Sequence, residues 1–163
     1  MNNHQEKEFL IAYEELADLL FRYCYFKTGD RELARDMVQD VFMKTWVYIE
    51  KGQDVQNFKT FLYHIASNLV VDWYRKKKTI ALDALAEHGF DPVDTTVNIE
   101  AEAELQQVMK VFSKLDKVDQ DLITLRYIED LPLQEICTIL NQTQNVISVR
   151  LHRAMTRLKH LLR

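Results

Sequence analysis

Glycine and proline are scarce in this chain, which has only three glycines and two prolines in 163 residues. Both residues mark turns, so this scarcity argues against a β-sandwich, a collagen-like repeat or a disordered tail. Leu, Ala, Glu, Gln, Lys and Arg dominate instead, and they are good helix formers. No apolar run approaches the ~18 residues of a membrane span, and the polar opening residues do not resemble a signal peptide. The composition predicts a soluble, intracellular, all-α protein.

Apolar residues at helical spacing fill most of the first 78 residues, which we expect to form one small domain. One apolar stripe runs from Phe9 to Tyr23. The chain then turns at Thr28-Gly29-Asp30, where glycine can take a positive φ and Asp30 can cap the next helix. Two further helices are predicted, over about Arg31–Ile49 and Phe58–Lys77.

The second half of the chain begins with residues 79–100, which have no sustained period and are predicted to be a linker. Within it, Ile80–Ala86 is a candidate short helix. A second small domain, residues 101–163, is predicted to contain about four helices, over Ala101–Lys114, Asp119–Ile128, Leu133–Leu140 and Gln144–Leu162.

The net charge of −4 is distributed unevenly. Residues 1–78 are neutral overall, residues 79–104 hold seven acids and no Lys or Arg, and residues 105–163 have a net charge of +3. After Glu135 the chain contains Lys and Arg but no Asp or Glu. Such asymmetry between segments indicates an interaction with a polyanion.

The sharpest pattern is a short amphipathic helix, a three-residue connection and a basic helix at the C-terminus. Thr143 is placed to cap the second of these helices. The free N–H groups at the start of that helix, and the positive end of its dipole, can meet a DNA phosphate. The arrangement is typical of a helix-turn-helix, whose second helix enters the major groove of DNA. Polar side chains at the start of that helix are expected to reach base edges, and arginines to hold phosphates: Gln144, Asn145 and Ser148 in the first group, and Arg150, Arg153 and Arg157 in the second. The alternative is an ordinary helical hairpin with a solvated basic face.

Four consecutive cations, Arg75 to Lys78, close the third helix. They can simply complement the helix dipole. The functional interpretation is a phosphate-binding patch for single-stranded nucleic acid, with His64, Asn68 and Tyr74 as candidates for base contacts.

The second helix carries an acid–amide–aromatic strip at helical spacing: Asp36, Gln39, Asp40 and Phe42. An exposed strip of this kind is a candidate protein-docking face with Phe42 as its anchor, although the two acids can equally be solvated helix charges. No metal or cofactor site is expected, because the Glu-x-x-His partners of a di-iron bundle are missing. No HExxH, phosphate loop or nucleophile–base pair indicates an enzyme, and Cys24 and Cys137 sit within apolar stripes as core residues.

Taken in their order along the chain, the three patterns resemble the extracytoplasmic-function (ECF) group of the bacterial sigma-70 family. The stretch from Ala34 to Phe42 is similar to the segment that docks on the β′ clamp helices of RNA polymerase. The stretch from Phe58 to Asn68, followed by Asp72 and Arg75, resembles the minus-ten reader, and residues 125–131 with 150–154 resemble the minus-thirty-five reader. The resemblance also implies the β flap, promoter DNA and an anti-sigma protein as partners, a bacterial cytoplasmic location, and base-proximal contacts at Asn57, with backbone contacts at Arg75, Lys76 and Lys77.

Two departures from the family pattern stand out. The family usually has Pro and then Arg where this chain has Asp116 and Gln120, and a Thr-Val-Lys-Ser run where this chain has Val146 to Val149. We expect a non-enzymatic initiation factor that binds RNA polymerase core and reads both promoter elements. Its linker acids either mimic nucleic acid in the polymerase or form a solvated tether. The alternative is a free-standing helix-turn-helix regulator whose N-terminal domain dimerises or senses a ligand.

Overall fold

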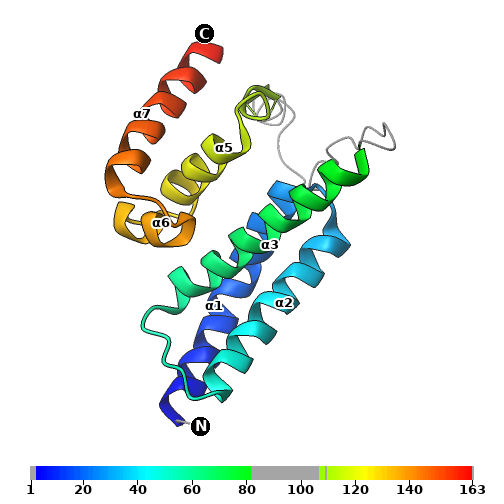
Figure 1. The fold of residues 1–163 in the computed structure, drawn as a ribbon, viewed down its shortest axis with the longest axis vertical. Helices are drawn as coiled ribbons and strands as arrows, with labels where there is room; N and C mark the ends of the chain where they lie inside the picture. Colours follow the sequence, from blue (N-terminus) through cyan, green and yellow to red (C-terminus); the bar gives the residue numbers. More distant parts are fainter. Residues whose placement is uncertain (1–2, 82–106, 109, 163) are drawn as a thin grey trace, which may run out of the picture. The chain divides into compact units, whose positions relative to one another are not determined.

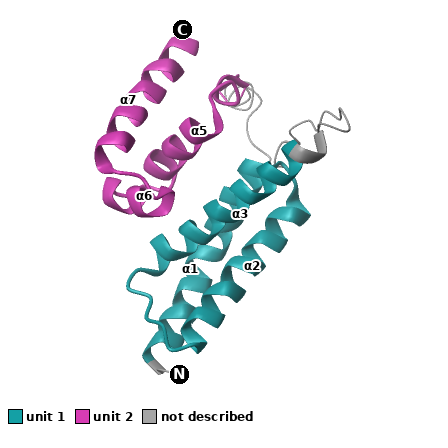
Figure 2. Cartoon of the chain, viewed as in Figure 1, with its two compact units in different colours: residues 1–91 teal, residues 92–163 magenta. Residues whose placement is uncertain are grey.

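A computed structural model of the chain describes residues 3–81, 107–108 and 110–162. The chain forms two compact units, residues 1–91 and 92–163 (Figure 2). Every regular element in the described residues is a helix, which confirms the predicted fold class of two small helical domains. Residues 82–100 of the linker, which include most of the short helix proposed over 80–86, and half of the helix proposed over 101–114 lie outside the described residues.

Unit 1 is a bundle of three long helices in which α1 packs against both others (Figure 1). Their bounds are α1 Asn3–Thr28, α2 Arg31–Glu50 and α3 Phe58–Ala81. The turn between α1 and α2 forms as predicted: Gly29 has φ +69°, and the Asp30 carboxylate accepts a hydrogen bond from Leu33 N at 3.1 Å. Helix α3 runs to Ala81, so it includes the first three residues of the predicted linker.

The core of unit 1 is built from the apolar stripes of all three helices. Leu20, Val41 and Leu62 are fully buried, and the rings of Tyr23 and Tyr63 meet edge to face at 5.4 Å. Dense packing of this kind holds the three helices in fixed register, and therefore fixes the faces that they present to solvent.

Unit 2 contains a helix-turn-helix. Its elements are α5 Lys117–Ile123, a π-helical turn η1 Thr124–Ile128, α6 Leu133–Leu140 and α7 Gln144–Leu161. The bounds of α6 are those predicted. Asn141 ends α6 in the left-handed conformation, with φ +50°, and Thr143 caps α7 by accepting a hydrogen bond from Val146 N.

The single helix predicted over 119–128 is wrong in two respects. It begins at Lys117, because the Asp116 side chain accepts a hydrogen bond from Asp119 N at 2.9 Å and so caps α5 two residues earlier. It also changes to the wider π-helical turn at Thr124. Within that turn, the Arg126 side chain donates to the Leu131 carbonyl at 2.9 Å and so holds the connection to α6.

Candidate nucleic-acid and polymerase interfaces

Helix α7 presents a polar and basic face to solvent. Ile147, Leu151 and Ala154 are buried in unit 2, which fixes the opposite side of α7 outward. The polar residues predicted at its start are all exposed, and so is Arg153. Because α7 contains no Asp or Glu, it carries no negatively charged side chain. The face has the composition that a DNA-contacting helix needs.

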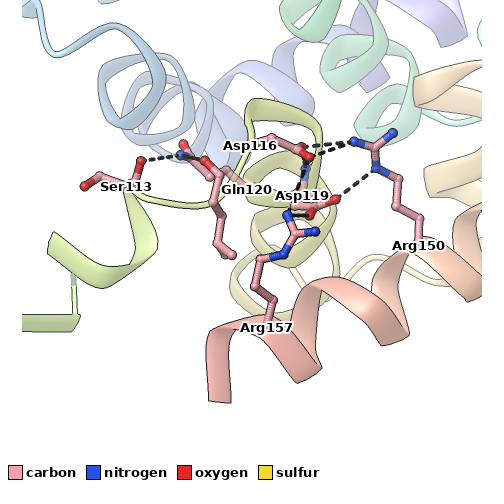
Figure 3. Close-up of polar contacts among 7 residues, drawn as sticks. Ser113, Asp116, Asp119, Gln120, Arg150 and Arg157 are labelled. Atoms are coloured by element: carbon pink, nitrogen blue, oxygen red, sulfur yellow. Dashed lines mark hydrogen bonds and ion pairs between the residues drawn. The ribbon is translucent and has the colours of Figure 1, made fainter. Parts of the chain in front are cut away.

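Arg150, one of the predicted phosphate contacts, is engaged within unit 2 (Figure 3). Its Nε donates to Asp119 Oδ1 at 2.9 Å, and its Nη2 donates to the two oxygens of Asp116 at 3.0 and 3.1 Å. The Asp119 side chain is only 6% exposed, whereas that of Arg150 is 40% exposed. The hydrogen bond to Asp119 is the main reason that the pKa of Arg150 is raised above its ordinary value.

Arg157 joins the same cluster two turns further along α7. Its Nη1 lies 3.4 Å from Asp119 Oδ2 and 4.0 Å from Asp116 Oδ2. Partial burial alone would raise the pKa of Asp116, but the N–H of Asp119 and the two guanidinium charges together hold it below its ordinary value. The four side chains, Asp116, Asp119, Arg150 and Arg157, are called the α5–α7 ion cluster below.

Asp116 and Gln120, which form one of the two departures from the family pattern, each have a structural role. Asp116 caps α5 and binds Arg150. Gln120 donates through Nε2 to the Leu115 carbonyl at 2.8 Å and to the Ser113 carbonyl at 3.4 Å (Figure 3). The two residues thereby fasten the segment that precedes α5 to the α5–α7 pair.

On α2, three of the four predicted docking residues are exposed, namely Asp36, Gln39 and Asp40. Phe42 is not: it is 5% exposed, and its ring packs against those of Tyr13 at 4.8 Å and Phe9 at 5.9 Å. Its prediction as an exposed anchor is wrong, because two aromatic side chains of α1 cover it.

An open groove of about 760 Å³ runs between α1 and α2, beside these exposed residues. Phe42 forms part of its floor, and the partly exposed Met43 and Val47 lie along it. Arg35 and Gln39 add polar groups to the same groove. The apolar surface offered by α2 therefore comes from Met43 and Val47, which the sequence reasoning did not select.

Four of the predicted minus-ten residues make contacts within unit 1. Asn57 accepts a hydrogen bond from Thr60 N at 3.0 Å and so caps α3, and the Tyr74 hydroxyl donates to the Lys27 carbonyl. His64 and Asn68, one turn apart on α3, lie 3.2 Å from each other.

The cations at the end of α3, Arg75, Lys76 and Lys77, are exposed. Arg75 lies 3.8 Å from Asp72, and the Lys77 ammonium lies 4.8 Å from the centre of the Trp73 ring. Contacts between such exposed groups are weak, so these cations keep most of their capacity to bind phosphate.

Metal ligation and thiol reactivity can be judged within the described part of the chain. No group of three His, Cys, Asp or Glu side chains there has the arrangement of a metal site. Burial raises the pKa of Cys24 to about 12, so this thiol is protonated and unreactive at neutral pH. No helix in the described ranges is long and apolar enough to cross a membrane.

Comparison with known proteins identifies both units. Residues 12–80 match the family described as Sigma-70 region 2, and residues 105–158 match the family described as Sigma-70, region 4. The chain is 33% identical over 170 residues to the ECF RNA polymerase sigma factor SigW of Bacillus subtilis, with 93% of this chain and 89% of SigW covered. The chain belongs to the ECF sigma factors.

A further relative and two solved structures are also similar to this chain. The sigma factor is 28% identical to the ECF sigma factor SigM of Bacillus subtilis, with 91% of each chain covered. Its fold is similar to that of the sigma factor RpoE from Bartonella quintana in complex with the anti-sigma factor NepR, with a TM-score of 0.77, 22% identity and coverage of 96% and 97% of the two chains. CnrH in complex with the cytosolic domain of CnrY has a TM-score of 0.70, 21% identity and coverage of 96% and 88%.

The sigma factor is thus a promoter-specificity factor and not an enzyme. Its sequence alone did not point to Asp119, the most buried member of the α5–α7 ion cluster. The available signal was the spacing of Asp116 and Asp119, which fits a helix cap, together with two arginines seven residues apart on α7.

Proposed function

We propose that this sigma factor docks on RNA polymerase core through α2, contacts the opened minus-ten element through α3 and the loop before it, and reads the minus-thirty-five element through α7. The observation that carries the proposal is the outward face of α7, which is free of acids and presents exposed polar residues on its first turns. The order of the two matched regions along the chain supports it. The free-standing regulator is not favoured, because both units match sigma regions.

The proposed docking surface consists of Asp36, Gln39 and Asp40, together with Met43 and Val47 of the adjoining groove. It combines exposed carboxylates with a partly exposed apolar strip, which is the mixture that protein interfaces use. The clamp helices of the β′ subunit are the proposed partner of unit 1, and the β flap is the proposed partner of unit 2.

For the minus-ten element, we assign base contacts to His64 and Asn68 and backbone contacts to Arg75, Lys76 and Lys77. A base flipped out of the stack would be read in a pocket of the loop over residues 52–57, near Asn57. Because the Asn57 and Tyr74 side chains already bind the backbone of unit 1, we propose that they shape this surface as much as contact bases.

For the minus-thirty-five element, we assign base contacts to Gln144, Asn145 and Ser148, with Thr143 and the start of α7 directed at a phosphate. Arg153 is the proposed main phosphate contact. Arg150 and Arg157 remain predicted phosphate contacts, but they would approach DNA with a carboxylate already bound. That carboxylate repels phosphate and lowers the gain from each contact.

Two substitutions on α7 test this assignment. Asn145→Ala should relax the base preference at one position, at a cost of about 1–3 kcal/mol if the contact is bidentate. Arg153→Ala should weaken all promoters about equally and reduce the salt dependence of binding by about one unit. Holoenzyme binding to a promoter series at several salt concentrations distinguishes the two effects. If the roles are exchanged, the face that we assign to DNA is rotated incorrectly.

Regulation by an anti-sigma protein is also proposed, since one similar fold is that of a sigma factor in complex with an anti-sigma factor. The site of action would be the bacterial cytoplasm, where RNA polymerase and the chromosome are found.

A further inference from the structure

Two valines stand exposed at the start of α7. Val146 is 47% exposed and Val149 is 44% exposed, whereas Ile147 between them is 1% exposed. Residues three apart on a helix are neighbours on its surface, so the two valines form one apolar patch. They contribute little to the core of unit 2, which Ile147, Leu151 and Ala154 supply from the same helix.

The valine patch lies within the face that we assign to DNA. Asn145 precedes Val149 by one turn and Arg153 follows it by one turn, so the three side chains form a column along α7. Both flanking residues are exposed, and α7 carries no acid. A partner that covers the patch must therefore offer negative charge and apolar groups on one surface. The major groove of DNA does so, because phosphates border it and the thymine C5-methyl group is its apolar feature.

We propose that Val146 and Val149 recognise thymine methyl groups in the minus-thirty-five element. The inference rests on the proposed function of α7 and adds the base feature that this part of the helix reads. The departure from the family pattern supports it: in place of Thr-Val-Lys-Ser, this chain has Val-Ile-Ser-Val, which removes a cation and, on balance, one hydroxyl group. It also adds two exposed apolar side chains. Recognition at these positions thus moves from polar and phosphate contacts to apolar contacts.

Replacement of thymine by deoxyuridine tests the proposal, because it removes only the methyl group and keeps every hydrogen bond of the base pair. The holoenzyme would first select its minus-thirty-five sequence from a randomised library, and each selected thymine would then be replaced in turn. At one or two positions, we expect wild-type holoenzyme to lose about fourfold in affinity, which corresponds to the ~0.8 kcal/mol of one buried methyl-sized group.

Val146→Ser and Val149→Ser are made as separate variants. Each should bind thymine and uracil promoters equally at the position that the replaced valine recognises. Val118→Ser is the matched control, because Val118 is similarly exposed on α5, at 43%, and lies outside the proposed DNA face. It should keep the full fourfold difference. All three positions are exposed, so the substitutions should leave the fold of unit 2 intact, as circular dichroism would verify.

The outcomes separate this inference from the function on which it rests. The inference is overturned if the selected sequence lacks thymine, if uracil is tolerated at every position, or if both serine variants keep the full wild-type discrimination at every position. In each of these cases an effect of Asn145→Ala on base preference would leave the reading role of α7 standing. If the library shows no enrichment upstream of the start site, the proposed function itself fails.

Discussion

Removal of the Arg150 side chain should destabilise unit 2, whereas removal of Arg153 should not. In Arg150→Ala, the nearly buried Asp119 carboxylate loses its 2.9 Å hydrogen bond and keeps only Arg157 at 3.4 Å. Loss of one such charge-assisted bond costs about 1.5–3 kcal/mol. The bonds to Asp116 add little, about 0–1 kcal/mol, because that side chain is half exposed. We expect a loss near 2 kcal/mol for Arg150→Ala and below about 0.5 kcal/mol for Arg153→Ala.

The two units can be followed separately in the intact chain. Both tryptophans, Trp46 and Trp73, belong to unit 1, so tryptophan fluorescence reports on unit 1. Circular dichroism at 222 nm reports on the helices of both units. For a unit of this size, 2 kcal/mol corresponds to a fall in Tm of about 8–16 °C. In Arg150→Ala, the circular dichroism transition of unit 2 should shift by this amount while the fluorescence transition stays in place.

The pH dependence provides an independent check on the ion cluster. The pKa of Asp116 is lower in the folded state than in the unfolded chain, where it is about 3.9. The stabilisation by Asp116 is therefore present above about pH 4 and is lost as the pH falls through the folded-state value. The difference in stability between wild type and Arg150→Ala should shrink over the same range. Equal stability of Arg150→Ala and Arg153→Ala at pH 7 would refute the structural role of the cluster.

Three further predictions concern unit 1. Asp36→Arg should weaken binding to polymerase core by about 1–3 kcal/mol, as loss of an interface anchor does. Glu50→Arg, at the far end of α2, should leave this affinity unchanged. Equal affinities of the two variants, with native circular dichroism, would contradict the docking assignment. Exchange of residues 51–57 for the loop of another ECF sigma factor should change the minus-ten preference in a promoter selection, and an unchanged preference would make the loop a connector. Cys24 should resist a thiol reagent at pH 8 until the chain is denatured, whereas the half-buried Cys137 should react in the native chain. Rapid modification of Cys24 in the native chain would contradict its burial.

The helices could be predicted because they carry apolar stripes and because α2 and α7 also begin at a recognisable cap. Asp30 and Thr143 cap the helices that they were expected to cap, and α6 has the bounds read from its pattern. The π-helical turn at Thr124 was missed, since a run of apolar residues with helical spacing looks the same in either helix type.

The candidate sites were predicted less completely, because their geometry depends on contacts between distant segments. The pattern of α2 alone gives Phe42 an outward position, but Phe9 and Tyr13, about thirty residues earlier in the chain, cover it. Likewise, the ion partners of Arg150 lie 31 and 34 residues away, and no periodicity links residues so far apart. Tertiary packing decides which of the predicted side chains remain available to a partner.

The most direct test of the account is promoter opening by polymerase core with and without this sigma factor. Core enzyme, purified without any sigma factor, would be mixed with the full chain and a promoter from the selection described above, and permanganate would detect unpaired thymines. We predict unpaired bases at the minus-ten element and initiation from a defined start site only when chain and core are both present. Specific binding of the chain alone to a palindromic duplex, with no opening after core is added, would contradict the account and indicate a free-standing regulator.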